Sequence, residues 1–179
     1  MSIEKDIVSR AKKGDGAAFA QLYEEHLDRI YRYVYLKVGN RTEAEDLTQE
    51  VFVKALEAIT TYKWRNLPFS SWLFRIAHNL VVDYFRKQGK VEKVALDDDI
   101  VLPSKSNPAL TAELALEIEA LAKDIENLSP AQREVILLRF SAELSTAEVA
   151  SFLAKNTGTV KALQHNAIVA LRKMSSSDK

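Results

Sequence analysis

The chain of 179 residues contains no cysteine. That absence excludes disulfide-stapled scaffolds, thiolate metal sites and cysteine nucleophiles, and it fits a reducing compartment. The sequence also lacks any apolar run long enough to cross a membrane. Its N-terminus is charged and amphipathic, without the apolar stretch of a secretory signal. We therefore expect a cytoplasmic protein without membrane insertion.

Motifs of catalysis and of metal binding are missing as well. The three histidines stand far apart in the sequence, and an isolated histidine on a helix is usually structural or surface-exposed. There is no P-loop, no metal-binding triad and no nucleophile motif. The sequence therefore predicts a protein that is not an enzyme, has no catalytic residues and needs neither metal nor cofactor. The histidines are His26, His78 and His165.

No segment shows the alternation of apolar and polar residues that a half-buried strand requires. Apolar residues recur at helical spacing instead, and turn residues such as Gly39 and Pro68 separate the helical segments. We predict an all-α fold of two small helical domains joined by an extended acidic linker, the C-terminal domain being a helix-turn-helix. The predicted domains are 1–89 and 111–179, and the linker is 90–110. Helices are predicted over 2–13, 17–38, 42–60, 69–87, 111–127, 130 to about 140, and twice within 145–173.

Residues 90–110 have the composition of a tether. Three consecutive aspartates occupy positions 97–99, and Pro103 and Pro108 follow among serines and an asparagine. Such a segment buries too little apolar surface to fold alone. We expect it to be extended and acidic.

The predicted helix over residues 42–60 has an acidic outer face. Thr42 is predicted to cap its first turn, with Glu45 completing a capping box. Its apolar residues recur on one face, which we expect to be core. The opposite face is either solvated or a docking surface for a basic partner, and the residues alone leave both readings open. The outward positions are Asp46, Gln49, Glu50 and Val53.

The next segment reverses the charge. Between residues 62 and 90 there are six basic residues and a single acidic one, Asp83, with seven aromatic rings among them. Rings that stack on bases and cations that follow phosphates form a platform for single-stranded nucleic acid. The alternative is that the rings are core, and Trp72 and Phe74 do have core spacing. Trp64, in a loop, is less easily explained as core.

Residues 145–173 carry the pattern of a helix-turn-helix. Ser145 is predicted to cap the first helix with Glu148 at the capping-box position. The turn falls at residues 156–158, and the second helix presents short polar and basic side chains in its first turns. Such a helix enters the major groove of DNA. A plain helical hairpin is the alternative reading of the same pattern.

Five segments together resemble a known family, the extracytoplasmic-function (ECF, group 4) sigma factors of the bacterial sigma-70 family. They occur in the family's order and spacing over nearly the whole chain. The segments are FAQLYEEHLDRIYRYVY (19–35), DLTQEVF (46–52), FSSWLFRIAHNLVVDYFR (69–86), LSPAQREVILLR (128–139) and GTVKALQHNAIVALR (158–172).

The resemblance implies a subunit that binds core RNA polymerase and directs promoter-specific transcription initiation, for a stress or envelope-signal regulon. It implies three further things about partners: duplex DNA is read at the −35 element, the melted non-template strand is captured at the −10 element, and an anti-sigma factor commonly holds such a subunit inactive. In family terms, residues 1–89 correspond to region 2 and residues 111–179 to region 4. The family's linker runs through the core enzyme toward the RNA path.

The resemblance also assigns roles to residues, position by position. The core-polymerase contacts fall on Asp46, Gln49, Glu50 and Val53. The −10 contacts fall on Trp64, Arg65, Asn66, Phe69, Arg75, Asn79, Asp83, Arg86 and Lys87. The −35 contacts fall on Thr157, Thr159, Lys161, Gln164, His165 and Arg172.

One position departs from the family pattern. Many members carry an arginine where Asn166 stands, and this departure bears on the list of −35 contacts, not on the family resemblance. Two other functions fit parts of the sequence. A stand-alone helix-turn-helix regulator would bind duplex DNA without polymerase, as a dimer on palindromic half-sites. A helical module that binds only protein is the other, and neither function needs a single-strand platform.

Overall fold

The computed structural model describes residues 3–63, 68–89, 116 and 122–177. Within these residues the regular structure is helical throughout and contains no strand, which confirms the predicted all-α fold. The predicted linker and most of the predicted helix 111–127 lie outside them. The elements are α1 (Ile3–Lys12), α2 (Gly16–Val38), α3 (Arg41–Ala58), η1 (Ile59–Thr61), α4 (Phe69–Lys87), α7 (Pro130–Ile136), η2 (Leu137–Ser141), α8 (Thr146–Phe152) and α9 (Thr157–Ser177).

The first four α-helices pack into one bundle with α2 at its centre. Helix α2 contacts α1, α3 and α4, and α3 also contacts α4. The apolar residues Leu22, Ile30 and Leu36 of α2 are buried. Tyr33 of α2 packs edge-on against Phe74 of α4, with ring centroids 5.5 Å apart. A large apolar side chain buried in this way stabilises the fold by about 1.5–3 kcal/mol. The bundle is therefore a rigid support for the outer faces of α3 and α4.

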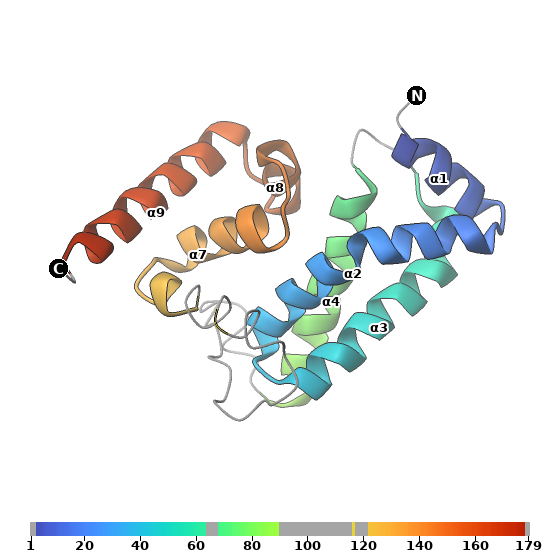
Figure 1. The fold of residues 1–179 in the computed structure, drawn as a ribbon, viewed down its shortest axis with the longest axis horizontal. Helices are drawn as coiled ribbons and strands as arrows, with labels where there is room; N and C mark the ends of the chain where they lie inside the picture. Colours follow the sequence, from blue (N-terminus) through green and yellow to red (C-terminus); the bar gives the residue numbers. More distant parts are fainter. Residues whose placement is uncertain (1–2, 64–67, 90–115, 117–121, 178–179) are drawn as a thin grey trace.

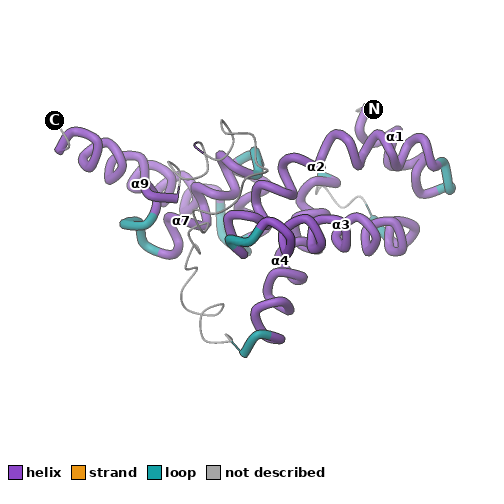
Figure 2. The backbone as a smooth tube through the Cα atoms, turned by 60° about the horizontal axis from the view of Figure 1, so that its bottom comes forward, coloured by secondary structure: helices purple, strands orange, loops and turns teal. Residues whose placement is uncertain are grey.

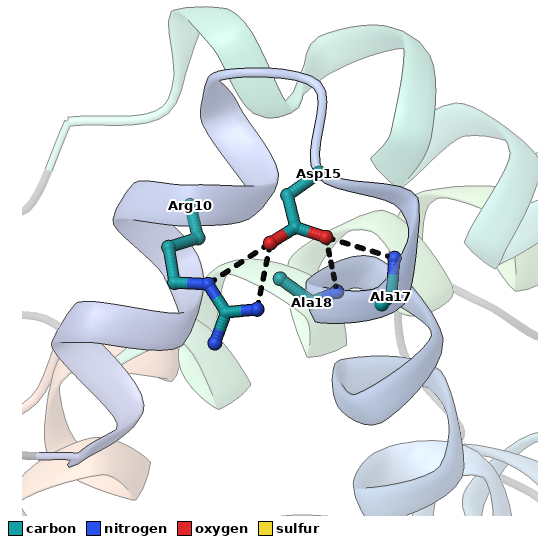
Figure 3. A network of polar contacts seen from close by, with 4 residues as sticks. All are labelled: Arg10, Asp15, Ala17 and Ala18. Atoms are coloured by element: carbon teal, nitrogen blue, oxygen red, sulfur yellow. Dashed lines mark hydrogen bonds and ion pairs between the residues drawn. The ribbon is translucent and has the colours of Figure 1, made fainter.

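A carboxylate fixes the corner between α1 and α2 (Figure 3). Asp15 caps α2 by accepting from the backbone N–H groups of Ala17 and Ala18, at 3.0 and 3.1 Å. Its other oxygen accepts two hydrogen bonds from the Arg10 guanidinium, at 2.7 and 2.9 Å. These hydrogen bonds, that from Arg10 foremost, hold the pKa of the Asp15 carboxyl below its usual value. The N-cap thus orients α1 as well as starting α2.

Helix α3 begins one residue earlier than predicted, and the predicted cap is wrong. Asn40 is the N-cap, with its side-chain oxygen accepting from the Glu43 N–H at 3.1 Å. Gly39 closes α2 in the left-handed conformation (φ 69°), so the chain turns immediately and Asn40 already occupies the cap position. Thr42 therefore falls inside the first turn, and Glu45 forms an ion pair with Arg41 instead of a capping box.

The C-terminal helices follow the predicted boundaries closely. Ser129 caps α7 in a capping box with Gln132, and Ser145 caps α8 in a second one with Glu148, as predicted for the latter. Helix α9 begins at Thr157, where Asn156 accepts from the Thr159 N–H at 2.7 Å. The predicted helix to about residue 140 differs only in its last part, which is the π-helical turn η2.

The C-terminal helices pack directly on the bundle. Helix α8 contacts α4, and η2 contacts α2, whereas α9 projects to the end of the molecule opposite α1 (Figures 1 and 2). The contact includes a buried ion pair between Lys37 of α2 and Glu134 of α7, each with its side chain 7% exposed. The two halves of the chain therefore meet in this structure.

Candidate docking and nucleic-acid interfaces

The outer face of α3 presents all four predicted docking residues. Asp46, Gln49, Glu50 and Val53 are exposed, and their spacing places them on one side of the helix. Gln49 donates to the Tyr23 hydroxyl at 3.1 Å, which ties this face to α2. The Glu50 carboxylate lies 3.8 Å from Lys54, and such an exposed pair holds the side chain only weakly. The face is acidic, accessible and supported by a rigid helix.

Leu56 extends this face, and the sequence reasoning missed it. Leu56 and Val53 are each 54% exposed and lie one helical turn apart. Two neighbouring apolar side chains within an acidic face are typical of an interface core rather than of a solvated surface. The i, i+3 spacing from Val53 was visible in the sequence and could have identified Leu56. We call Asp46, Gln49, Glu50, Val53 and Leu56 the docking face.

A groove of about 350 Å³ runs between α3 and α4 beside the docking face. Asp46 and Glu50 line it from α3, and Asp83 and Lys87 line it from α4. Asp83 also forms an ion pair with Arg86 at 3.5 Å. A carboxylate in this position attracts a basic partner and repels DNA phosphates. The geometry thus groups Asp83 with the docking face, and its predicted −10 role rests on the resemblance alone.

The remaining predicted −10 residues of α4 form an exposed stripe, with one exception. Arg75, Asn79, Arg86 and Lys87 are all exposed along one side of the helix. The exception is Phe69, which is 1% exposed. Its burial argues against direct DNA contact in this arrangement. The loop residues Trp64, Arg65 and Asn66 lie outside the described residues.

Phe69 instead belongs to an aromatic cluster under the start of α4. Its ring packs against Tyr62, Trp72 and His26, with centroids 5.8, 5.4 and 5.6 Å away. Burial, aided by the nearby Arg29 cation, lowers the pKa of His26 from 6.5 to about 4. The imidazole is therefore neutral at pH 7. The cluster holds the chain immediately before the predicted −10 loop.

The N-terminal half of α9 is open to solvent on its outer side. Val160 and Ala167 are fully buried on the inner side. Gln164 is half-buried and accepts from the Arg139 guanidinium at 3.0 Å, which fixes its amide. No sequence pattern marks Arg139 for this positioning role, because the two residues lie on different helical segments. The other predicted −35 residues are exposed on α9: Thr157, Thr159, Lys161, His165 and Arg172. Such a face has the shape and polarity to enter a major groove.

Neither a metal site nor a membrane span is found in the part of the chain that is described. There, no three histidine or acidic side chains are placed to hold a metal ion. Nor is any helix in those residues long and apolar enough to cross a membrane. The described residues form three exposed surfaces of distinct character. The surface on α3 is acidic and apolar, the one on α4 is basic, and the one on α9 is polar.

Comparison with known proteins matches both halves of the chain to one family. Residues 22–91 match the family model described as Sigma-70 region 2, and residues 125–173 match Sigma-70 region 4. The chain is 37% identical to the ECF RNA polymerase sigma factor BldN of Streptomyces coelicolor over 97% of its own length and 66% of that protein. It is 35% identical to SigW of Bacillus subtilis, also an ECF RNA polymerase sigma factor, over 97% of its own length and 96% of SigW.

Two solved structures share the fold. CnrH, in complex with the cytosolic domain of CnrY, aligns with a TM-score of 0.70 over 99% of this chain and all of that one, at 24% identity. The sigma factor RpoE of Bartonella quintana, in complex with the anti-sigma factor NepR, aligns with a TM-score of 0.66 over 90% of this chain and 98% of RpoE. With both region models matched in order and SigW matched over nearly its whole length, the chain belongs to the ECF sigma factors of the sigma-70 family.

Proposed function

We propose that this chain is a sigma subunit that binds core RNA polymerase and directs it to start transcription at particular promoters. One observation carries the proposal: a single rigid bundle presents an acidic and apolar face on α3 beside a basic stripe on α4. A duplex-binding regulator needs only a face like that of α9. The other two faces are explained by a protein partner and by a second DNA contact.

The docking face is proposed to bind the core enzyme. Its carboxylates attract a basic surface, and Val53 with Leu56 supplies the apolar centre that a stable contact requires. The groove beside it, with Asp83 on its α4 wall, accommodates basic side chains of the partner. Because the subunit works on the polymerase, we place it in the cytoplasm, and as an initiation factor it has no enzymatic activity of its own.

DNA recognition is proposed to be divided between α4 with its preceding loop and α9. The melted −10 strand would follow Arg75, Asn79, Arg86 and Lys87, with Trp64, Arg65 and Asn66 of the loop taking an unstacked base. The duplex −35 element would meet the outer side of α9. An anti-sigma factor is a further proposed partner, as NepR is for RpoE.

Start-site mapping tests the function. Purified core enzyme is supplied with a library of candidate promoters, with and without this chain, and RNA 5′ ends are sequenced. We expect new start sites that share upstream elements and depend on the chain. Absence of new starts, together with tight binding of the chain alone to palindromic duplex, would identify a stand-alone regulator instead.

A further inference from the structure

A second groove, of about 390 Å³, lies on the bundle between α1 and the residue that ends η1. Its lining side chains are Lys5, Val8, Ser9, Lys12, Lys13 and Tyr62. Three of them carry a positive charge, and neither acidic residue of α1, Glu4 or Asp6, is among these described lining residues. The groove between α3 and α4 has the opposite character, because four carboxylates and two lysines line it. The bundle therefore presents one groove that suits a basic partner and one that suits an anion. We call the second one the basic groove.

Helical spacing places polar side chains along one edge of the basic groove. Lys5, Ser9 and Lys12 follow one another at i, i+4 and i+7 on α1, and all three are at least partly exposed. Beneath them Val8 is 3% exposed and Tyr62 is 5% exposed. The Tyr62 ring belongs to the aromatic cluster under the start of α4. The cations therefore stand over a rigid apolar floor.

The basic groove is continuous with the proposed −10 loop. The Lys12 ammonium donates to the backbone carbonyl of Tyr62 at 2.6 Å, which ties α1 to the residue two positions before Trp64. Lys63, between them, is exposed. An ammonium group carries three N–H donors, so Lys12 can hold this carbonyl and also donate to a phosphate oxygen. The chain thus enters the loop at the edge of the basic groove.

The chemistry of the basic groove suits a nucleic-acid backbone and not base edges. Its polar lining groups are ammonium and hydroxyl groups, which bind phosphate oxygens, and it includes no amide or guanidinium to pair with a base in two places. Lys5 and Lys12 are separated by about 10 Å along the helix. At ~3.4 Å per nucleotide along one strand, that length corresponds to about three nucleotides.

We propose that the basic groove binds phosphates of the non-template strand on the 3′ side of the −10 element. The proposal rests on the proposed function and lengthens the strand that the chain holds. Melting extends from the −10 element toward the start site, so a strand that leaves the loop on its 3′ side is single. The lysines of α1 neutralise its phosphates as point charges, and the Ser9 hydroxyl adds a donor. The contact is independent of base sequence.

Fluorescence anisotropy with core enzyme and chain together tests the proposal on two labelled non-template strands. One strand ends with the −10 element, and the other continues for about four nucleotides on the 3′ side. For the unaltered chain we expect the longer strand to bind at least about fivefold more tightly.

Lys5→Gln with Lys13→Gln removes two charges and keeps Lys12, which holds the Tyr62 carbonyl. This double variant should lose most of the gain from the longer strand and should bind the short strand normally. With about 0.7 counterions released per phosphate contact of a single strand, its salt dependence on the longer strand should be shallower by about 1.4. That difference is roughly sevenfold in affinity between 50 and 200 mM salt.

Lys123→Gln with Lys155→Gln is the matched control, since it makes the same charge change at exposed positions elsewhere. It should keep the full gain. Circular dichroism and affinity for core enzyme, which should be the same for all chains, show that each variant is folded.

Uncharged methylphosphonate linkages in the extension complete a cycle between the lysines and the phosphates. They should abolish the gain for the unaltered chain and change little more for the double variant, because each alteration removes the same contact.

Three results would overturn the basic groove as a phosphate site: a full gain retained by the double variant, an equal loss in the control, or losses from lysines and linkages that simply add. Failure of the proposed function has a different signature. In that case core enzyme with the unaltered chain binds the short strand no better than core enzyme alone.

Discussion

Glu50 is the docking-face residue with the clearest charge test. Glu50→Lys places a cation where a basic partner is expected, so affinity for core polymerase should fall by about 2 kcal/mol or more, roughly thirtyfold. The side chain is exposed, and its one ion pair among the described residues is the one with Lys54, so helix content and melting temperature should stay the same. Fluorescence-detected titration of labelled chain with core enzyme measures the loss.

Asp6→Lys is the matched control, since Asp6 is an exposed carboxylate on α1, away from the docking face. It should bind core enzyme like the unaltered chain. Equal losses for the two variants would point to a general charge effect and would remove Glu50 from the docking face.

His26 predicts a specific dependence of stability on pH. Its pKa is about 4 in the folded chain, below the ordinary 6.5 of the unfolded one. Between pH 6.5 and 4 the unfolded state therefore binds more protons than the folded state. The stability that comes from burying the neutral imidazole is fully present above pH 6.5. It is lost as the pH falls, and at pH 4 the free energy of unfolding should be lower by roughly 3 kcal/mol.

His26→Leu removes the titrating group, whereas all other ionisable groups remain. Urea unfolding of both proteins at several values between pH 7 and pH 4 isolates the histidine, because the other titrations cancel in the difference. We expect the free energy of unfolding to fall less steeply for the variant. Parallel curves would mean that the imidazole has the same pKa in the folded and the unfolded chain.

At the scale of single elements, the start of α3 separates two candidate caps. Asn40 accepts from the Glu43 N–H, whereas Thr42 lies within the first turn. Asn40→Ala should therefore cost about 1 kcal/mol of stability, and Thr42→Ala should cost only a few tenths. Chemical unfolding measures both losses of stability. A larger loss for Thr42→Ala than for Asn40→Ala would identify Thr42 as the cap, as predicted from the sequence.

The recognition surface of α9 offers a gain-of-function test. Asn166 is exposed beside His165, where an added cation would face a phosphate. Asn166→Arg should tighten binding of the holoenzyme to duplex −35 DNA by roughly 1 kcal/mol, about fivefold, and should steepen its salt dependence by about one counterion. Asn127→Arg, at another exposed asparagine, is the control. Equal effects of the two would place the −35 contact elsewhere.

At the scale of the whole molecule, the sequence predicted the helices because their apolar stripes and caps are local signals. Ser145 and Glu148 illustrate this, since one capping box marks the start of α8 both in the sequence and in the structure. The contact between the halves had no such signal. Lys37 and Glu134 lie 97 positions apart, and each reads as an ordinary surface charge until the fold brings them together.

The candidate surfaces were predictable where helical periodicity decides exposure, and not where a contact between distant segments decides it. Exposed positions on α3 and α9 follow from helical periodicity, and these residues lie at the surface except Gln164, which is half-buried. Phe69 does not, because its burial depends on the cluster with Tyr62 and Trp72, which forms only when η1 and α4 meet. Leu56 follows Val53 at i+3, so the same helical periodicity could have placed it on the docking face. The roles of all these residues remain predictions.

The central claim is that this chain reads a promoter as part of RNA polymerase and not alone. Fluorescence anisotropy of one promoter fragment, labelled and single-stranded over the −10 element, tests it with the chain alone, with core enzyme alone and with both together. Our account predicts tight, sequence-specific binding only for the mixture, and its loss for the Glu50→Lys chain. Equally tight and specific binding by the chain alone, unaffected by core enzyme, would contradict it.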